Sequence, residues 1–117
     1  MATIKSFTSL EQSRKLAEIL PLESADLSYM SFDNHITLCP YIKMINDGFN
    51  KDEVIPCWSL AALLGVLQYP ALFQRTDQKW GCTVWVYTKH PYSISLEDSP
   101  INACVAMIEK LNELKML

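Results

Sequence analysis

Cys57 is the residue with the strongest argument for chemistry in this sequence. A proline at position 56 suits the first turn of a helix, and the positive N-terminal end of a helix favours the thiolate, the nucleophilic form of cysteine. Nucleophilic catalysis also needs a base within reach, and the two histidines, His35 and His90, stand far from Cys57 in the chain. Because cysteine is among the most buried residue types, we prefer a core thiol, assign no catalytic residue, and keep a thiol-dependent enzyme or redox-responsive factor using Cys57 as an alternative.

Metal and cofactor chemistry has less support. His35 and Cys39 share strand parity, but a structural zinc site needs four ligands and no second pair accompanies them. The four cysteines stand 18, 25 and 22 residues apart, without the close pairs of a metal site or the density of a disulfide scaffold. The three glycines are isolated, so no phosphate-binding loop is present in the sequence. We therefore expect no metal and no cofactor, and buried thiols in a reducing compartment.

Aromatic residues are the remaining candidates, for binding instead of catalysis. If helices cover only one side of the predicted sheet, either Trp85 and Tyr87 or Trp80 and Val84 lie on its uncovered face. An exposed aromatic patch of this kind usually marks a protein–protein contact. The alternative is that loops or the N-terminal helix cover that face. The predicted interaction residues are Trp80, Trp85, Tyr87 and Trp58.

The elements that must position these residues begin with a helix over residues 9–20. Ser9 and Gln12 can form a capping box, and Pro21 ends the helix. Residues 27–32 and 36–39 then flank Asp33-Asn34, a pair typical of tight turns, and predict a β-hairpin. The polar stretch 44–53 is predicted to be a surface loop.

The uncharged run from residue 55 to residue 67 predicts a short central helix that is apolar on nearly every side. Its apolar part is ten residues long, whereas a membrane span needs roughly 17–25. Such a helix must be buried in its own fold or covered by a partner. We expect it to be buried, with Trp58 near its start.

The second half of the chain predicts two strands and a helix. Residues 80–88 are rich in β-branched and aromatic residues and have no polar face, which is typical of a strand in the interior of a sheet. Residues 92–96 alternate and can pair with them, and Ser99 with Pro100 begins a helix that runs to Leu114. The predicted fold is a single α+β domain over residues 1–117, in the order α-β-β-α-β-β-α. It has one antiparallel sheet of about four strands with helices packed on one face.

Length and composition narrow the class of protein. A chain of 117 residues is about one domain, and half its residues are apolar or aromatic while a fifth are charged, as in ordinary globular proteins. The net charge is −3, and the bases are not clustered, so we expect no nucleic-acid partner. The N-terminus lacks the apolar segment of a secretion signal. We expect a cytoplasmic protein without membrane contact.

Several short motifs together resemble a family of small uncharacterised proteins from Bacteroides-group bacteria and from their phages and mobile elements. The most specific of them is Pro-x-Trp-Ser-Leu at residues 56–60, and the resemblance spans most of the chain. The other matching residues are Glu11-Gln12-Ser13 with Leu16, Leu63-Leu64, Trp80-Gly81, and Asp98-Ser99-Pro100 with Ala103. This family has no assigned activity, so the resemblance implies a bacterial or mobile-element origin and no functional residue.

The sequence therefore predicts a small interaction or assembly module that acts through a protein partner or through self-association as a homodimer. This prediction follows from the apolar residues of the chain, which offer more apolar surface than three helices on one sheet face can cover. Two alternatives remain: the thiol-dependent protein using Cys57, and a small-ligand-binding domain with a pocket between the central helix and the sheet.

Overall fold

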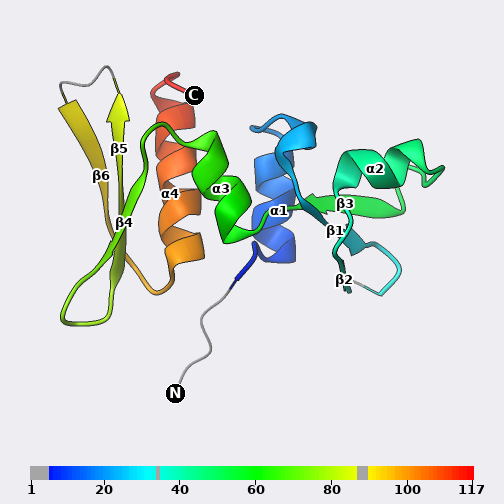
Figure 1. The fold of residues 1–117 in the computed structure, drawn as a ribbon, viewed down its shortest axis with the longest axis horizontal. Coiled ribbons are helices and arrows are strands. Elements are labelled where there is room, and N and C mark those ends of the chain that lie inside the picture. The colour runs from blue at the N-terminus through cyan, green and yellow to red at the C-terminus, as the bar shows by residue number, and fades with distance from the viewer. Residues whose placement is uncertain (1–5, 34, 87–89) are drawn as a thin grey trace. The chain divides into compact units, whose positions relative to one another are not determined.

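The computed structural model describes the backbone of residues 6–33, 35–86 and 90–117, and the side chains of these ranges except 86–96. It combines helices with antiparallel sheets, which confirms the predicted α+β class (Figure 1). The helices are α1 (Leu10–Ala17), α2 (Tyr41–Asn46), α3 (Leu60–Val66) and α4 (Pro100–Glu113), with a 3₁₀ turn η1 (Leu22–Ser24). The strands are β1 (Leu27–Met30), β2 (Ile36–Thr37), β3 (Val54–Cys57), β4 (Ala71–Gln74), β5 (Trp80–Val86) and β6 (His90–Glu97).

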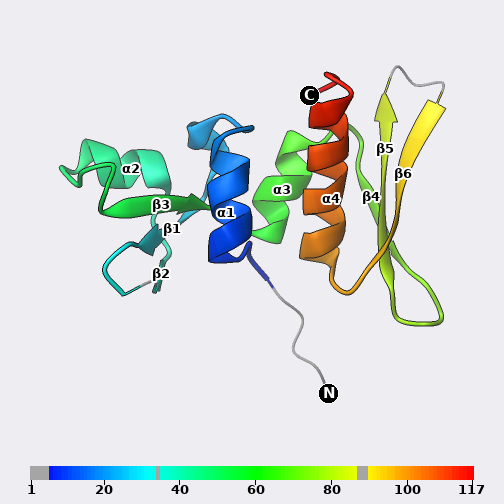
Figure 2. The same cartoon turned by 180° about the vertical axis from the view of Figure 1, so that it is seen from behind.

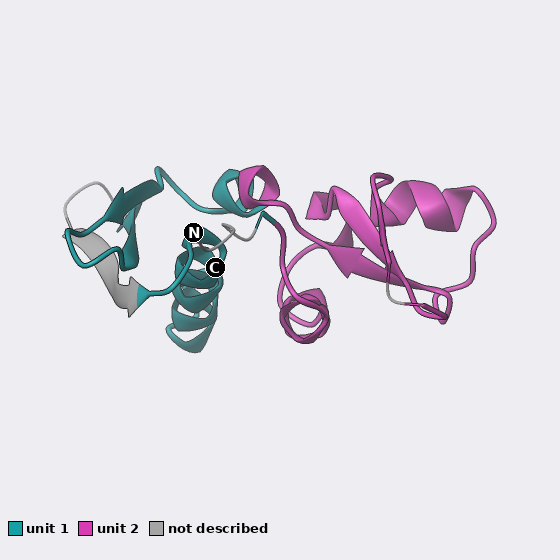
Figure 3. Cartoon of the chain, turned by 90° about the horizontal axis from the view of Figure 1, so that it is seen from below, with its two compact units in different colours: residues 1–6, 63–117 teal, residues 7–62 magenta. Residues whose placement is uncertain are grey.

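The chain divides into two compact units (Figure 3). Unit 2 holds residues 7–62, and unit 1 holds residue 6 together with residues 63–117, so one boundary falls inside α3. Each unit contains one three-stranded antiparallel sheet, in the orders β2-β1-β3 and β4-β5-β6. The strands therefore form two separate sheets, whereas the sequence predicted a single sheet of about four strands. That residues 1–117 form a single domain stays a prediction.

Unit 2 is built around β1, the central strand of its sheet. All four residues of β1 are buried, because β2 and β3 flank it and its side chains pack on both faces. The register pairs Leu27 with Cys57 and Met30 with Val54. Helices α1 and α2 contact β3. The predicted hairpin is confirmed in β1 and β2, although Asn34 of its turn lies outside the described residues.

Helix α1 begins as its sequence predicts. The Ser9 hydroxyl accepts a hydrogen bond from Gln12 N at 3.1 Å, and the Gln12 side chain accepts one from Ser9 N at 3.0 Å, which completes the capping box. The helix ends at Ala17, three residues earlier than predicted, and Pro21 instead precedes η1.

Unit 1 packs one long helix against its sheet. Helix α4 contacts β5 and β6, and Figures 1 and 2 show it alongside this sheet from both sides. Ser99 caps α4 by accepting a hydrogen bond from Asn102 N at 3.1 Å, and Pro100 occupies the first turn, as predicted. Eight α4 residues are buried, and strand β5 is central in its sheet, as its apolar character predicted.

Three segments differ from the prediction. The first part of the predicted central helix is strand β3, and only Leu60–Val66 is helical. The segment after Pro40 forms α2 where the sequence predicted a strand end and a loop. Strand β4, after Pro70, was not predicted. In the part of the chain that the structure describes, no helix combines the length and the apolar character needed to cross a bilayer.

Candidate functional site

Cys57 does not lie at a helix N-terminus. It is the last residue of β3, it is 0% exposed, and α3 begins three residues later at Leu60. Burial raises the pKa of the Cys57 thiol, and the nearby Asp26 carboxylate raises it further, although hydrogen bonds from the Thr8 and Ser13 side chains act in the opposite direction. The premise of a helix-activated thiolate is therefore wrong, because the backbone at this point is extended and the thiol is held in its neutral form.

A buried polar cluster surrounds this thiol. Thr8 Oγ1 lies 2.7 Å from Ser13 Oγ and 3.5 Å from Cys57 Sγ, and the Tyr29 hydroxyl donates to Thr8 O at 2.8 Å. Thr8 N also donates to Trp58 O at 2.9 Å, while Trp58 N donates to Thr8 Oγ1 at 3.2 Å. These bonds join the segment before α1 to the end of β3. The cluster satisfies buried polar groups and stabilises unit 2.

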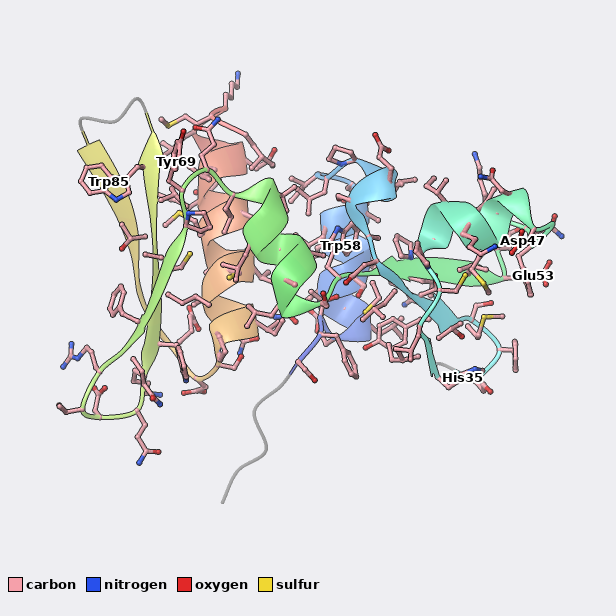
Figure 4. The ribbon with its side chains drawn as sticks, in the orientation of Figure 1. His35, Asp47, Glu53, Trp58, Tyr69 and Trp85 are labelled. Atoms are coloured by element: carbon pink, nitrogen blue, oxygen red, sulfur yellow. The ribbon has the colours of Figure 1, made fainter. Side chains whose placement is uncertain are left out.

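The structure does not bring His35 to Cys57. Cys57 pairs with Leu27 at one end of β1, whereas the backbone of His35 bonds Met30 at the other end, about 10 Å along the strand. The His35 ring lies on the surface, where Nδ1 is 2.5 Å from Asp33 Oδ1 (Figure 4). The side chain of His90 is outside the described residues. The base that a Cys57 nucleophile would need is therefore not supplied by His35.

Trp58 is a core residue of unit 2. Its side chain is 0% exposed, and its indole Nε1–H donates to Ser24 Oγ at 2.9 Å. A buried indole with a satisfied N–H is typical of a packed interior. Trp58 was a predicted interaction residue, and in this structure its ring is not accessible to a partner.

The two sides of β5 differ sharply. Cys82 and Val84 are both 0% exposed, whereas Trp85 is 42% exposed, with its ring on the side of β5 away from α4 (Figure 4). Alternation along the strand therefore places Trp85 and Thr83 on the uncovered side. The sequence left open whether Trp85 and Tyr87 or Trp80 and Val84 lie on the uncovered face, and the structure places Trp85 there and Val84 in the core. Tyr87 lies outside the described residues, and Trp80 is half-buried.

Strand β4 completes the uncovered side. Its register places Ala71 opposite Thr83 and Phe73 opposite Gly81, so Ala71 and Phe73 share a face with Trp85. Phe73 is 40% exposed, and Ala71 is exposed as well. We call this surface the outer sheet face, formed in the described residues by Ala71, Phe73, Thr83 and Trp85. Tyr69, which precedes β4, is 75% exposed.

Gly81 explains why Phe73 is held on this face. A Cβ atom at position 81 would lie within 3.0 Å of three Phe73 ring atoms, so the ring rests directly on the glycine backbone. The register also shifts between Trp80 and Cys82, which marks an irregularity in β5 at this point. An aromatic ring packed over a strand glycine covers exposed backbone and fixes the register of neighbouring strands.

The outer sheet face carries no charged residue among its described members. The turn between β4 and β5 does carry charges: Arg75 Nη2 is 3.5 Å from Asp77 Oδ2, and Lys79 forms an ion pair with Asp98. An uncharged surface with two partly exposed aromatic rings can bind by burying apolar area and aromatic side chains. Among its described residues the outer sheet face has no carboxylate, imidazole, amine or thiol.

Sequence reasoning missed Phe73 as a functional residue. Its signal was weak, because β4 is four residues long and carries a single aromatic side chain. The one available hint was the pair Phe73 and Gly81, an aromatic residue and an isolated glycine in segments that a short turn could pair.

Within residues 6–33, 35–86 and 90–117, no three His, Cys, Asp or Glu side chains are grouped so that they could hold a metal ion. The resemblance to Bacteroides-group and phage proteins stays a prediction. No protein-family model, curated protein or solved structure matches this chain.

Proposed function

We propose that this protein is a small interaction or assembly module that binds through the outer sheet face of unit 1, and that the partner is a second copy of the chain. The observation that carries the proposal is the exposure of Trp85 and Phe73, at 42% and 40%, on a sheet face whose described residues carry no charge. Side chains of this type dominate the binding energy of protein interfaces.

The lack of charge among Ala71, Phe73, Thr83 and Trp85, the part of this face that the structure describes, favours self-association. A symmetric dimer places the same patch of each copy against the other, so any charge near the twofold axis meets its own sign. The chain as a whole carries a net charge of −3, and that charge opposes association wherever acidic surfaces meet. The outer sheet face avoids this cost, because Ala71, Phe73, Thr83 and Trp85 are neutral.

The proposed setting is the cytoplasm of a bacterium or of a cell that carries a mobile element, as the sequence resemblance implies. We propose no nucleic-acid, membrane, metal or cofactor partner. An enzyme that uses Cys57 is not favoured, because the thiol is buried and burial raises its pKa. The small-ligand alternative has only the aromatic content of the chain in its favour.

Sedimentation velocity from low to high micromolar concentration tests the proposal. The wild-type protein should shift from monomer to dimer as its concentration rises. Trp85→Asp should remain monomeric, because a dimer would bury two unpaired carboxylates. Trp85→Ser is the second variant, with the same expected direction and a smaller disturbance of the strand.

A matched control uses an exposed apolar residue in unit 2. Leu38 is 88% exposed, and Leu38→Asp adds the same charge as Trp85→Asp at a different surface. It should dimerise like the wild type. A folded wild-type protein that is monomeric at every concentration contradicts the proposal, and so does a Leu38→Asp variant that dissociates as fully as Trp85→Asp. In the first case the partner is not a second copy, and in the second it is not this face that binds it.

A further inference from the structure

Tyr69 has an unusual backbone conformation for its residue type. Its φ of 45° lies in the left-handed region, which a bulky residue rarely adopts, and it precedes Pro70, a position at which an extended backbone is preferred. Tyr69 is 75% exposed, so its ring gains little from packing within its own chain. Such a conformation persists only where the surrounding structure fixes it, and residues of this kind gather at functional sites.

The other residues with this conformation have local reasons for it. In the described part of the chain, the residues other than glycine with a positive φ are Tyr69, Gln78 and Lys115. Gln78 is the third residue of the turn between β4 and β5, the usual left-handed position of such turns, and its N donates to Arg75 O at 2.9 Å. Lys115 follows α4 as a left-handed cap, and its N donates to Asn112 O at 3.1 Å. Tyr69 lies three residues past the end of α3, so neither reason accounts for it.

The pairing of β4 with β5 fixes Tyr69 in this conformation. Ala71 pairs with Thr83, so a continued register would pair Tyr69 with Trp85. Instead, Trp85 N donates to Gln68 O at 3.3 Å, one residue earlier in the chain. The extra residue is absorbed at Tyr69 as in a β-bulge, an irregularity that redirects a side chain and is common next to functional sites.

We infer that Tyr69 is a binding residue of the interface that the outer sheet face forms with a second copy of the chain. The inference rests on the proposed function and extends the binding surface beyond β4 to the rim beside Trp85. Figure 4 shows Tyr69 and Trp85 at the same end of the sheet, and the bond from Trp85 N to Gln68 O joins their two segments.

Tyrosine suits the rim of such an interface. Its ring can bury apolar area against the partner while its hydroxyl stays in contact with water or forms a hydrogen bond. Tyrosine is also enriched among the residues that dominate the binding energy of protein interfaces. In a symmetric dimer each copy contributes its own Tyr69, so one substitution removes two rings.

Tyr69→Gly separates binding from folding. Glycine adopts the left-handed backbone without steric cost, and this gain exceeds the extra freedom that glycine gives to the unfolded chain. The variant should therefore unfold at a higher urea concentration than the wild type, both measured where they are monomeric, because dimerisation itself stabilises the folded state. In sedimentation velocity the same variant should dimerise at least about tenfold more weakly than the wild type.

Two matched variants isolate the ring from the backbone. Gln78→Gly relieves a φ of 70° without removing an aromatic side chain, so it should also raise the urea midpoint while dimerising like the wild type. Tyr69→Phe keeps the ring and the left-handed backbone, so it should dimerise more tightly than Tyr69→Gly. Equal weakening in Tyr69→Phe and Tyr69→Gly overturns the role of the ring.

Two further results overturn the inference and leave the proposed function standing. In the first, the wild type dimerises and Trp85→Asp does not, but Tyr69→Gly dimerises like the wild type. In the second, Tyr69→Gly unfolds at a lower urea concentration than the wild type, because the ring would then be part of the fold. A wild-type protein that is monomeric at every concentration contradicts the proposed function itself, and the inference falls with it.

Discussion

Replacing Trp58 with alanine should destabilise the protein by about 3–5 kcal/mol. The ring is 0% exposed, so truncation loses the transfer free energy of the whole indole and leaves a cavity in unit 2. It also removes the hydrogen bond from Nε1 to Ser24 Oγ, a bond of the kind that contributes about 0.5–1.5 kcal/mol. Since small domains have about 5–15 kcal/mol of stability, the variant should be close to unfolding at room temperature.

Urea unfolding followed by far-ultraviolet circular dichroism measures this loss, and two further variants divide it into parts. Trp58→Phe keeps most of the apolar area and loses the N–H, so it should cost about 1–3 kcal/mol. Trp85→Ala is the matched control, because it removes the same side chain from a position that is 42% exposed. Its cost should be about 1 kcal/mol or less, as for most surface substitutions.

The order of these three costs is the test. Our reasoning predicts that Trp58→Ala costs most, Trp58→Phe less, and Trp85→Ala least. A Trp58→Ala variant that unfolds at the wild-type urea concentration would refute it, because a ring with no solvent exposure cannot be removed without loss of packing. The ring would then have to be accessible in solution, as expected of an interface residue.

Three further predictions concern single residues. Burial, followed by the charge of Cys57, raises the pKa of the Tyr29 phenol to about 12, so stability should be fully present below about pH 10 and fall by about 1–3 kcal/mol as the pH rises toward 12. Chemical denaturation across that range should show a smaller fall in Tyr29→Phe than in the wild type, because Cys57, whose pKa is also raised, still titrates in the variant. Equal slopes in the two proteins would contradict the prediction. Cys57 should react with an alkylating reagent far more slowly than Cys39 in the native protein, and equal rates would restore the reactive-thiol hypothesis. Gly81→Ala should force the Phe73 ring from its place and cost about 1–3 kcal/mol. In a protein that already carries Phe73→Ala, Gly81→Ala should lower the free energy of unfolding by less than it does in the wild type. If urea unfolding shows instead that the costs of the two substitutions simply add, the contact between Phe73 and Gly81 is contradicted.

The parts of the fold that could be predicted are those with a local physical cause. Ser9 with Gln12 and Ser99 with Pro100 begin helices through bonds within a few residues, so their sequence is sufficient. The central position of β5 followed from a strand without a polar face. These signals are short-range and do not depend on what packs against them.

The segment before Trp58 could not be assigned in this way. A short apolar run suits a buried strand as well as a buried helix, and the choice is made by distant partners. Here Val54–Cys57 pairs with β1, and Thr8 bonds the backbone of Trp58 from 50 positions away. The division of the strands between two sheets depends on long-range pairing of the same kind, so it could not be predicted from the sequence either.

The candidate site was predicted in part. Alternation placed Trp85 and Val84 on opposite faces of β5, but which face a helix covers depends on α4, and only the structure shows that Val84 is buried. Phe73 joins the face only through the pairing of β4 with β5.

The most direct test of the central claim is the concentration dependence of the sedimentation coefficient for the wild type and for Trp85→Asp, both first shown to be folded. Self-association through the outer sheet face predicts that the wild type moves from monomer to dimer while Trp85→Asp stays monomeric. Identical behaviour of the two folded proteins at every concentration would contradict it.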